Sequence, residues 1–94
     1  MAVVVKFEFA DEMRESYDRV WREHADTVAA APGRLSHLCY LTEHGFTVVD
    51  VWESRDAFEA FGPTVAPILD AIGIRGEAQF FTVHNHVPAV DPGA

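Results

Sequence analysis

Apolar residues recur at every second position in residues 2–9, a period that is typical of a β-strand. The same β-branched and aromatic character returns in three later segments, at residues 34–42, 46–52 and 77–87. Glu43-His44-Gly45 separates the first two of these segments and predicts a hairpin turn. We therefore expect four strands, of which the second and third form a hairpin.

Two segments between these strands repeat apolar residues every three or four positions, which predicts helices. The first helix is expected to begin at Asp11 as its N-cap and to end at Pro32-Gly33. Its apolar stripe comprises Met13, Tyr17, Val20, Trp21, His24 and Val28. The second helix is expected over Ser54–Ile72, with a break or kink at Gly62-Pro63, because proline removes a backbone hydrogen bond.

The predicted order β-α-β-β-α-β is that of the α+β ferredoxin-like fold, a four-stranded antiparallel sheet with both helices on one face. We expect one domain over residues 1–87 and a flexible tail over residues 88–94, which contain two prolines and a glycine. The third and fourth strands carry apolar residues in both phases. Because such strands need cover on both faces, we predict a homodimer that forms through the open face of the sheet.

Composition limits the classes of partner. The net charge of −8 argues against nucleic acid, which requires a basic surface, and against anionic membranes. The sequence contains neither a signal-peptide pattern nor an apolar run long enough to span a bilayer, so a cytoplasmic location is expected. Cys39 is the only cysteine, which excludes an internal disulfide and predicts a buried structural thiol.

These features resemble the dimeric α+β barrel superfamily, which includes antibiotic biosynthesis monooxygenase-like proteins. The resemblance extends over nearly the whole chain. It rests on Pro32-Gly33 before a strand and on Val51-Trp52-Glu53-Ser54 before Ala57-Phe58. The run from Val48 to Phe58 and the closing Phe80-Phe-Thr-Val-His-Asn85 look like a set of short, mostly uncharacterised members.

The resemblance implies several activities, because this fold carries many functions. Members include cofactor-independent oxygenases of aromatic polyketides, polyketide cyclases, isomerases and haem-degrading enzymes. The haem-degrading members combine a pocket tryptophan, matched by Trp52, with an asparagine on the first strand and a histidine on the second helix. Both partners are missing here, so haem degradation is not expected. Cyclase members use a sheet histidine with a tyrosine as acid and base.

Histidines on the predicted strands are the candidate catalytic groups, because imidazole exchanges protons near neutral pH. We expect His84 to act as the base and His37 or Tyr40 to supply a second hydrogen bond. The expected pocket residues are Trp52, Phe58, Tyr17, His24 and Asn85. The alternative for each histidine is a hydrogen-bonded structural role. A hydrophobic aromatic or polyketide-like molecule is the expected ligand, and no cofactor is expected.

Three charged residues on the central strands, Lys6, Glu8 and Asp50, leave two interpretations open. They form ion pairs at a dimer interface, or they form the polar floor of a pocket. A metal held by His84 and His86 with a third ligand is a weaker alternative, and no metal is predicted. The competing functional hypothesis is a non-catalytic binding or structural dimer. A ligand-sized cavity would favour an enzyme.

Overall fold

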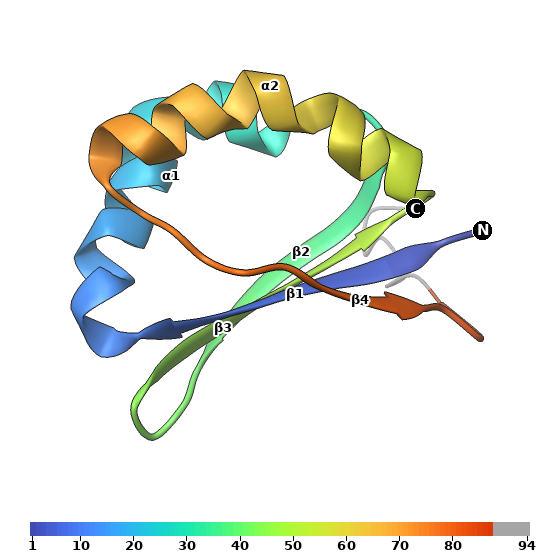
Figure 1. The fold of residues 1–94 in the computed structure, drawn as a ribbon, viewed down its shortest axis with the longest axis horizontal. Helices are drawn as coiled ribbons and strands as arrows, with labels where there is room; N and C mark the ends of the chain where they lie inside the picture. The colour runs from blue at the N-terminus through green and yellow to red at the C-terminus, as the bar shows by residue number, and fades with distance from the viewer. Residues whose placement is uncertain (88–94) are drawn as a thin grey trace, which may run out of the picture.

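The computed structural model describes residues 1–87 and contains four strands, two α-helices and a short 3-10 helix (Figure 1). The predicted flexible tail at residues 88–94 lies outside the described residues. In chain order the elements are β1 (Val3–Ala10), η1 (Asp11–Met13), α1 (Arg14–Ala29), β2 (Arg34–Leu41), β3 (Gly45–Trp52), α2 (Arg55–Ile72) and β4 (Gln79–Thr82).

The strands form one antiparallel sheet in the order β2-β3-β1-β4. Both helices lie across one face of this sheet, and the other face carries no helix (Figure 1). The observed order and layers confirm the predicted α+β ferredoxin-like fold.

Strand β4 is much shorter than the predicted segment 77–87. Its four residues pair with the stretch of β1 that begins at Val3. Beyond Thr82 the ladder continues only through the hydrogen bond from Val83 N to Ala2 O, at 3.0 Å. β4 thus ends at the level where β1, its neighbour in the sheet, begins. Residues 84–87 therefore lie outside the sheet.

The helices differ from expectation at three points. Asp11 opens the 3-10 helix η1 and does not cap α1, which begins at Arg14. Helix α1 has a kink at His24, whose φ and ψ are −130° and 26°. Helix α2 runs unbroken through Pro63 and Pro67, so the predicted break is wrong. Both prolines are exposed, and water can therefore bond the backbone carbonyls that they leave without an N–H donor.

The junction between β3 and α2 follows the predicted pattern. Ser54 adopts an extended conformation, and its Oγ accepts a hydrogen bond of 3.0 Å from the Ala57 backbone N–H. A serine N-cap satisfies one of the unpaired amides at a helix start. The chain therefore leaves the sheet directly after Trp52, whose side chain is buried at 2% exposure. This tight connection holds α2 over the sheet.

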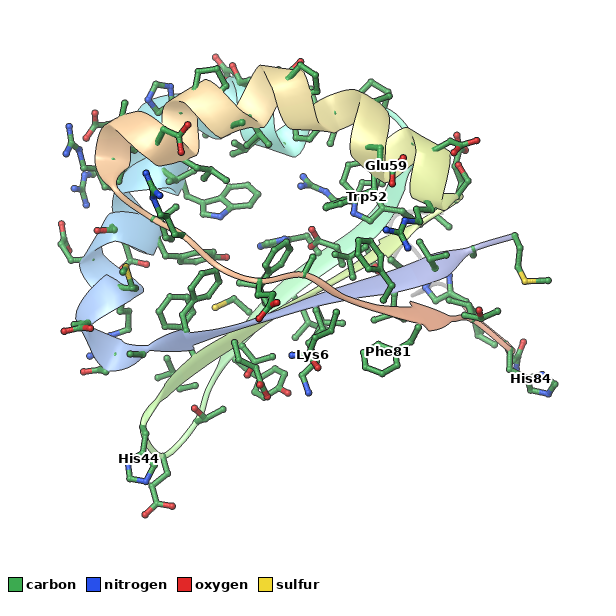
Figure 2. All side chains as sticks on the ribbon, viewed as in Figure 1. Lys6, His44, Trp52, Glu59, Phe81 and His84 are labelled. Carbon is green, nitrogen blue, oxygen red and sulfur yellow. The ribbon has the colours of Figure 1, made fainter. Side chains whose placement is uncertain are left out.

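Strand register assigns the side chains to two faces. Val5 pairs with Asp50 and Val3 with Trp52, so these positions share the face covered by the helices. Side chains at the alternate positions point away from the helices, as those of Lys6 and Phe81 do in Figure 2. On that open face Leu38, Tyr40 and Phe81 are exposed at 53%, 45% and 50%.

Candidate functional site

A cavity of about 220 Å³ lies between the helices and the sheet. Its lining is almost entirely apolar and includes large aromatic side chains from every layer. The polar residues on its wall are Tyr17, Arg34, His37 and Asp50. Because an apolar cavity of about 150 Å³ binds benzene in another protein, this volume is sufficient for a ring-sized ligand.

A chain of hydrogen bonds joins three of these polar residues. His37 Nδ1 lies 2.5 Å from Asp50 Oδ1, and His37 Nε2 lies 2.8 Å from the Tyr17 hydroxyl. The carboxylate can only accept, so Nδ1 carries the proton in the neutral imidazole and Nε2 presents a lone pair. Tyr17 O–H then donates to Nε2. We call this chain of side chains the Tyr17–His37–Asp50 relay.

Two strands and a helix position the relay. His37 on β2 lies directly opposite Asp50 on β3, and Tyr17 reaches down from α1. The side chains of His37 and Asp50 are only 18% and 10% exposed. Burial of the carboxylate is costly unless it is hydrogen-bonded, and the imidazole N–H provides that bond.

Burial also keeps the tyrosine protonated. Desolvation is the largest influence on Tyr17 and raises the pKa of its phenol well above the ordinary value, with the nearby Cys39 thiol as a further contributor. Burial likewise raises the pKa of the Cys39 thiol. Tyr17 is therefore a hydrogen-bond donor at neutral pH, and His37 Nε2 is the basic atom of the relay.

Aromatic rings enclose the relay and the cavity. The Trp21 ring lies 4.9 Å from the His37 ring, and the Tyr17 ring stacks on His37 at 6.2 Å. Farther along the cavity, Trp52 contacts Phe58 edge-on at 5.6 Å between centroids. These walls exclude water and present flat faces to a planar ligand.

The structure brings together some of the predicted site residues. Along the cavity it places His37, Tyr17, Trp52 and Phe58. His84 and Asn85 follow the end of β4, are exposed and do not line the cavity. Figure 2 shows His84 at the margin of the molecule, pointing away from the helices. A base role for His84 therefore has no geometric support within this chain.

Two further predicted residues lie elsewhere. Tyr40 pairs with Thr47 on the open face of the sheet, opposite to the cavity, and its side chain is 45% exposed. It has no contact route to a ligand held beneath the helices. His24 occupies the kink of α1, is partly buried and does not line the cavity.

The charged residues of the central strands separate onto the two faces. Lys6 Nζ lies 3.4 Å from Glu8 Oε1 on the open face. Asp50 turns to the helix-covered face and forms part of the cavity wall. The sequence contained a signal for its pairing, since the turn at Glu43-His44-Gly45 fixes the hairpin register that places Asp50 opposite His37.

Two kinds of feature are absent from the part of the chain that the structure describes. Residues 1–87 contain no group of three or more His, Cys, Asp or Glu side chains arranged to hold a metal ion. In the same part of the chain, no helix combines the length and apolar character needed to cross a bilayer.

The fold and the mostly apolar cavity define a ferredoxin-like protein with a small-molecule-sized pocket. Residues 1–64 match the sequence profile of a family described as antibiotic biosynthesis monooxygenase, and the chain belongs to this family, as the resemblance predicted. A comparison with curated proteins finds no match.

Solved structures share the fold over nearly the whole chain. SnoaB from Streptomyces nogalater, a cofactor-independent oxygenase, is 21% identical with a TM-score of 0.63, covering 94% of this chain and 96% of that protein. Rv0793 from Mycobacterium tuberculosis is 14% identical with a TM-score of 0.70, covering 92% of this chain and 98% of its own. At these low sequence identities, the similarity to the solved structures shows a shared fold only.

Proposed function

We propose that this protein is an enzyme that oxidises a hydrophobic aromatic or polyketide-like molecule with dioxygen and without a cofactor. The observation that carries the proposal is the Tyr17–His37–Asp50 relay on the wall of an apolar cavity. Membership of the monooxygenase family supports the reaction class. The fold shared with SnoaB, itself a cofactor-independent oxygenase, is consistent with it.

In the proposed first step, the substrate loses a proton from a carbon conjugated with a carbonyl group. His37 Nε2 is the final acceptor, because Nδ1 is already bonded to Asp50. Tyr17 transmits the proton, since its hydroxyl oxygen can accept the substrate hydrogen while its own proton passes to Nε2. Asp50 stabilises the resulting imidazolium.

The carbanion then reacts with dioxygen. It forms a carbon–oxygen bond to give a peroxide anion, which takes back the proton held by His37. The resulting hydroperoxide loses water and leaves a new carbonyl group. A methylene group and O₂ thus become a carbonyl group and H₂O, and the electrons come from the two C–H bonds that are broken. No external reductant enters this balance. The apolar walls favour this chemistry because they hold substrate and dioxygen away from bulk water.

Oxygen consumption with an anthrone tests the proposal, because an anthrone is an aromatic ketone with an acidic ring methylene. The wild type is expected to consume oxygen and to form the quinone, and His37→Gln is expected to lower the rate by about 10²–10⁴-fold. His44→Gln is the control, since His44 lies in the hairpin turn at 90% side-chain exposure. An unchanged rate in His37→Gln would contradict the assignment.

The same experiment examines the sequence-based alternatives. His84→Gln is included because His84 was the first candidate base, and we expect it to retain the wild-type rate. If the wild type binds the anthrone tightly but consumes no oxygen, the chain is a non-catalytic binding module and the enzymatic proposal fails.

A further inference from the structure

Helix α2 presents one face to the cavity, and that face contains a glycine. The residues that α2 contributes to the cavity wall are all apolar, and they recur at steps of three and four positions, which places them on one side of the helix. They are Phe58, Phe61, Gly62, Val65 and Leu69. Gly62 therefore interrupts a row of large apolar side chains on the wall of the cavity.

The backbone does not require this glycine. Among the glycines of residues 1–87, positive φ values occur at Gly33 and Gly73, so Gly62 has the ordinary conformation of a helix. Glycine inside a helix lowers its stability relative to alanine. A following proline restricts the residue before it, but Ala66 precedes Pro67 in the same helix. Helix α2 therefore accepts a side chain at such a position.

Packing within the chain does not require the glycine either. Gly76 also lines the cavity, and a Cβ there would lie 2.5 Å from the ring of Phe9, so this close approach explains Gly76. At Gly62, by contrast, no atom of residues 1–87 lies within 4 Å of the would-be Cβ. A larger apolar side chain would fit there and would bury more surface. The space beside Gly62 is left open on the cavity wall.

The relay and Gly62 belong to different walls of the cavity. Tyr17, His37 and Asp50 come from α1, β2 and β3, whereas Gly62 comes from α2. A ligand whose reacting atom lies at the relay can therefore extend toward α2. Because the α2 wall is apolar, burial of a charged or polar group against it would be unfavourable. The part of the ligand that reaches this wall is an uncharged hydrocarbon.

We propose that Gly62 determines the length of the ligand that the cavity accepts, because the space beside it holds a hydrocarbon portion of that ligand. This inference rests on the proposed function, since it concerns the site at which the substrate binds. A long ligand fills the space and makes contacts that a short ligand lacks. A larger side chain at position 62 occupies the same space, so it weakens binding of the long ligand and spares the short one.

Two alkylbenzenes test this inference without requiring turnover. Toluene and n-butylbenzene share the ring and differ in the length of the alkyl chain, and isothermal titration calorimetry measures both affinities. Each buried methylene group strengthens binding, so we expect the wild type to bind n-butylbenzene at least about tenfold more tightly than toluene. In Gly62→Leu this preference should fall to about one, while the affinity for toluene stays within about twofold of the wild type.

Ala66→Leu is the matched control, because Ala66 also precedes a proline of α2 but is exposed. It should keep the wild-type preference for n-butylbenzene. Gly62→Ala tests whether the fold itself needs the glycine, and we expect it to unfold at the same urea concentration as the wild type or at a higher one. A clearly lower urea midpoint would overturn the inference, since the glycine would then serve the helix.

Binding of the wild type can also overturn the inference without any variant. It fails if the wild type binds the two alkylbenzenes equally or binds neither of them. An equal loss of affinity for both ligands in Gly62→Leu would overturn it as well, because the substitution would then block the whole cavity and would not select by length.

The two proposals fail in different ways. If Gly62→Leu keeps the preference for n-butylbenzene while the wild type oxidises the anthrone, the oxygenase proposal stands and the role of Gly62 is wrong. If Gly62→Leu loses the preference but the wild type consumes no oxygen with the anthrone, Gly62 determines ligand length in a binding protein and the oxygenase proposal is wrong.

Discussion

At the scale of single residues, each member of the relay has one chemically consistent orientation. Asp50 accepts a hydrogen bond from Nδ1 of His37, and Nε2 accepts one from the Tyr17 hydroxyl. Burial keeps this hydroxyl protonated, because it raises the pKa of the phenol. This order fixes the tautomer of the imidazole before a ligand arrives. A site that is organised in advance need not reorganise during the reaction, and that is where most electrostatic catalysis originates.

Substitution of Asp50 by Asn tests this order directly. The amide can donate a hydrogen bond to Nδ1, which favours the tautomer with the proton on Nε2 and removes the basic lone pair. We expect the oxidation rate to fall by about 10²–10⁴-fold while the affinity for the anthrone is retained. Oxygen uptake and calorimetry measure the two quantities. Asp26→Asn, on the exposed surface of α1, is the control. A rate equal to the wild type would show that Asp50 does not orient the base.

The raised pKa of Tyr17 predicts a pH dependence of stability. Because the folded state holds the phenol proton more tightly than the unfolded state, the unfolded chain ionises first as pH rises. The free energy of unfolding should therefore decline above about pH 10, the ordinary pKa of tyrosine. Denaturant titrations from pH 8 to 11 should show a shallower decline in Tyr17→Phe. Tyr40→Phe, which removes the other tyrosine from the open face, should keep the wild-type slope.

Part of this site was predictable from strand phase and helical spacing. Tyr17 and Trp52 follow from the apolar stripe of α1 and from the end of β3. Tyr40 was a poor choice because it is three residues from His37, and residues an odd number apart in a strand face opposite sides. His84 has the phase of Phe80, but β4 ends at Thr82, where its pairing with β1 reaches Val3.

At the scale of elements, the loop between α1 and β2 positions Arg34. Gly33 has a φ of 85°, and a Cβ there would lie 2.7 Å from the Ala57 Cβ. Its carbonyl accepts a hydrogen bond of 2.8 Å from Glu53 N–H, which ties the loop to the start of α2. The backbone therefore needs glycine for both its conformation and its close approach to the helix.

Alanine substitutions at Gly33 and Gly73 separate the effect of the positive φ from the effect of the close approach. Gly73 also has a positive φ, of 90°, but nothing lies within 4 Å of its would-be Cβ. We expect Gly73→Ala to cost about 1 kcal/mol of unfolding free energy through backbone strain alone. Gly33→Ala introduces the same backbone strain and also a clash with Ala57, so it should lower the unfolding free energy by about 2–4 kcal/mol. Urea denaturation measures both. Equal losses would show that the loop relaxes away from Ala57.

The order and type of the elements were predictable because each carries its own local period. Their ends depended on contacts that a local pattern does not contain. Helix α2 continues through Pro63 because its exposed carbonyls can bond to water, whereas the sequence alone indicated a break. Strand β4 ends early, at the level where its partner strand β1 begins.

At the scale of the whole molecule, the two faces of the sheet differ sharply in how they are covered. The helices cover one face, while Leu38, Tyr40 and Phe81 leave large apolar surfaces exposed on the other. Large exposed apolar side chains on one face of a sheet are typical of an interaction site in small proteins. The acidic surface elsewhere, with a net charge of −8, disfavours association except through this face. A second copy of the chain offers the same apolar surface.

We therefore predict a homodimer that buries the open face, and Phe81→Glu as the change that disrupts it. Light scattering after gel filtration should give about twice the chain mass of 10.4 kDa for the wild type. A carboxylate buried in an apolar interface without a partner is strongly unfavourable, so Phe81→Glu should elute as a monomer at micromolar concentration. Ala66→Glu adds the same charge on the exposed side of α2 and should remain dimeric. A monomeric wild type would refute the interface, whereas a dimeric Phe81→Glu would assign the contact to another surface.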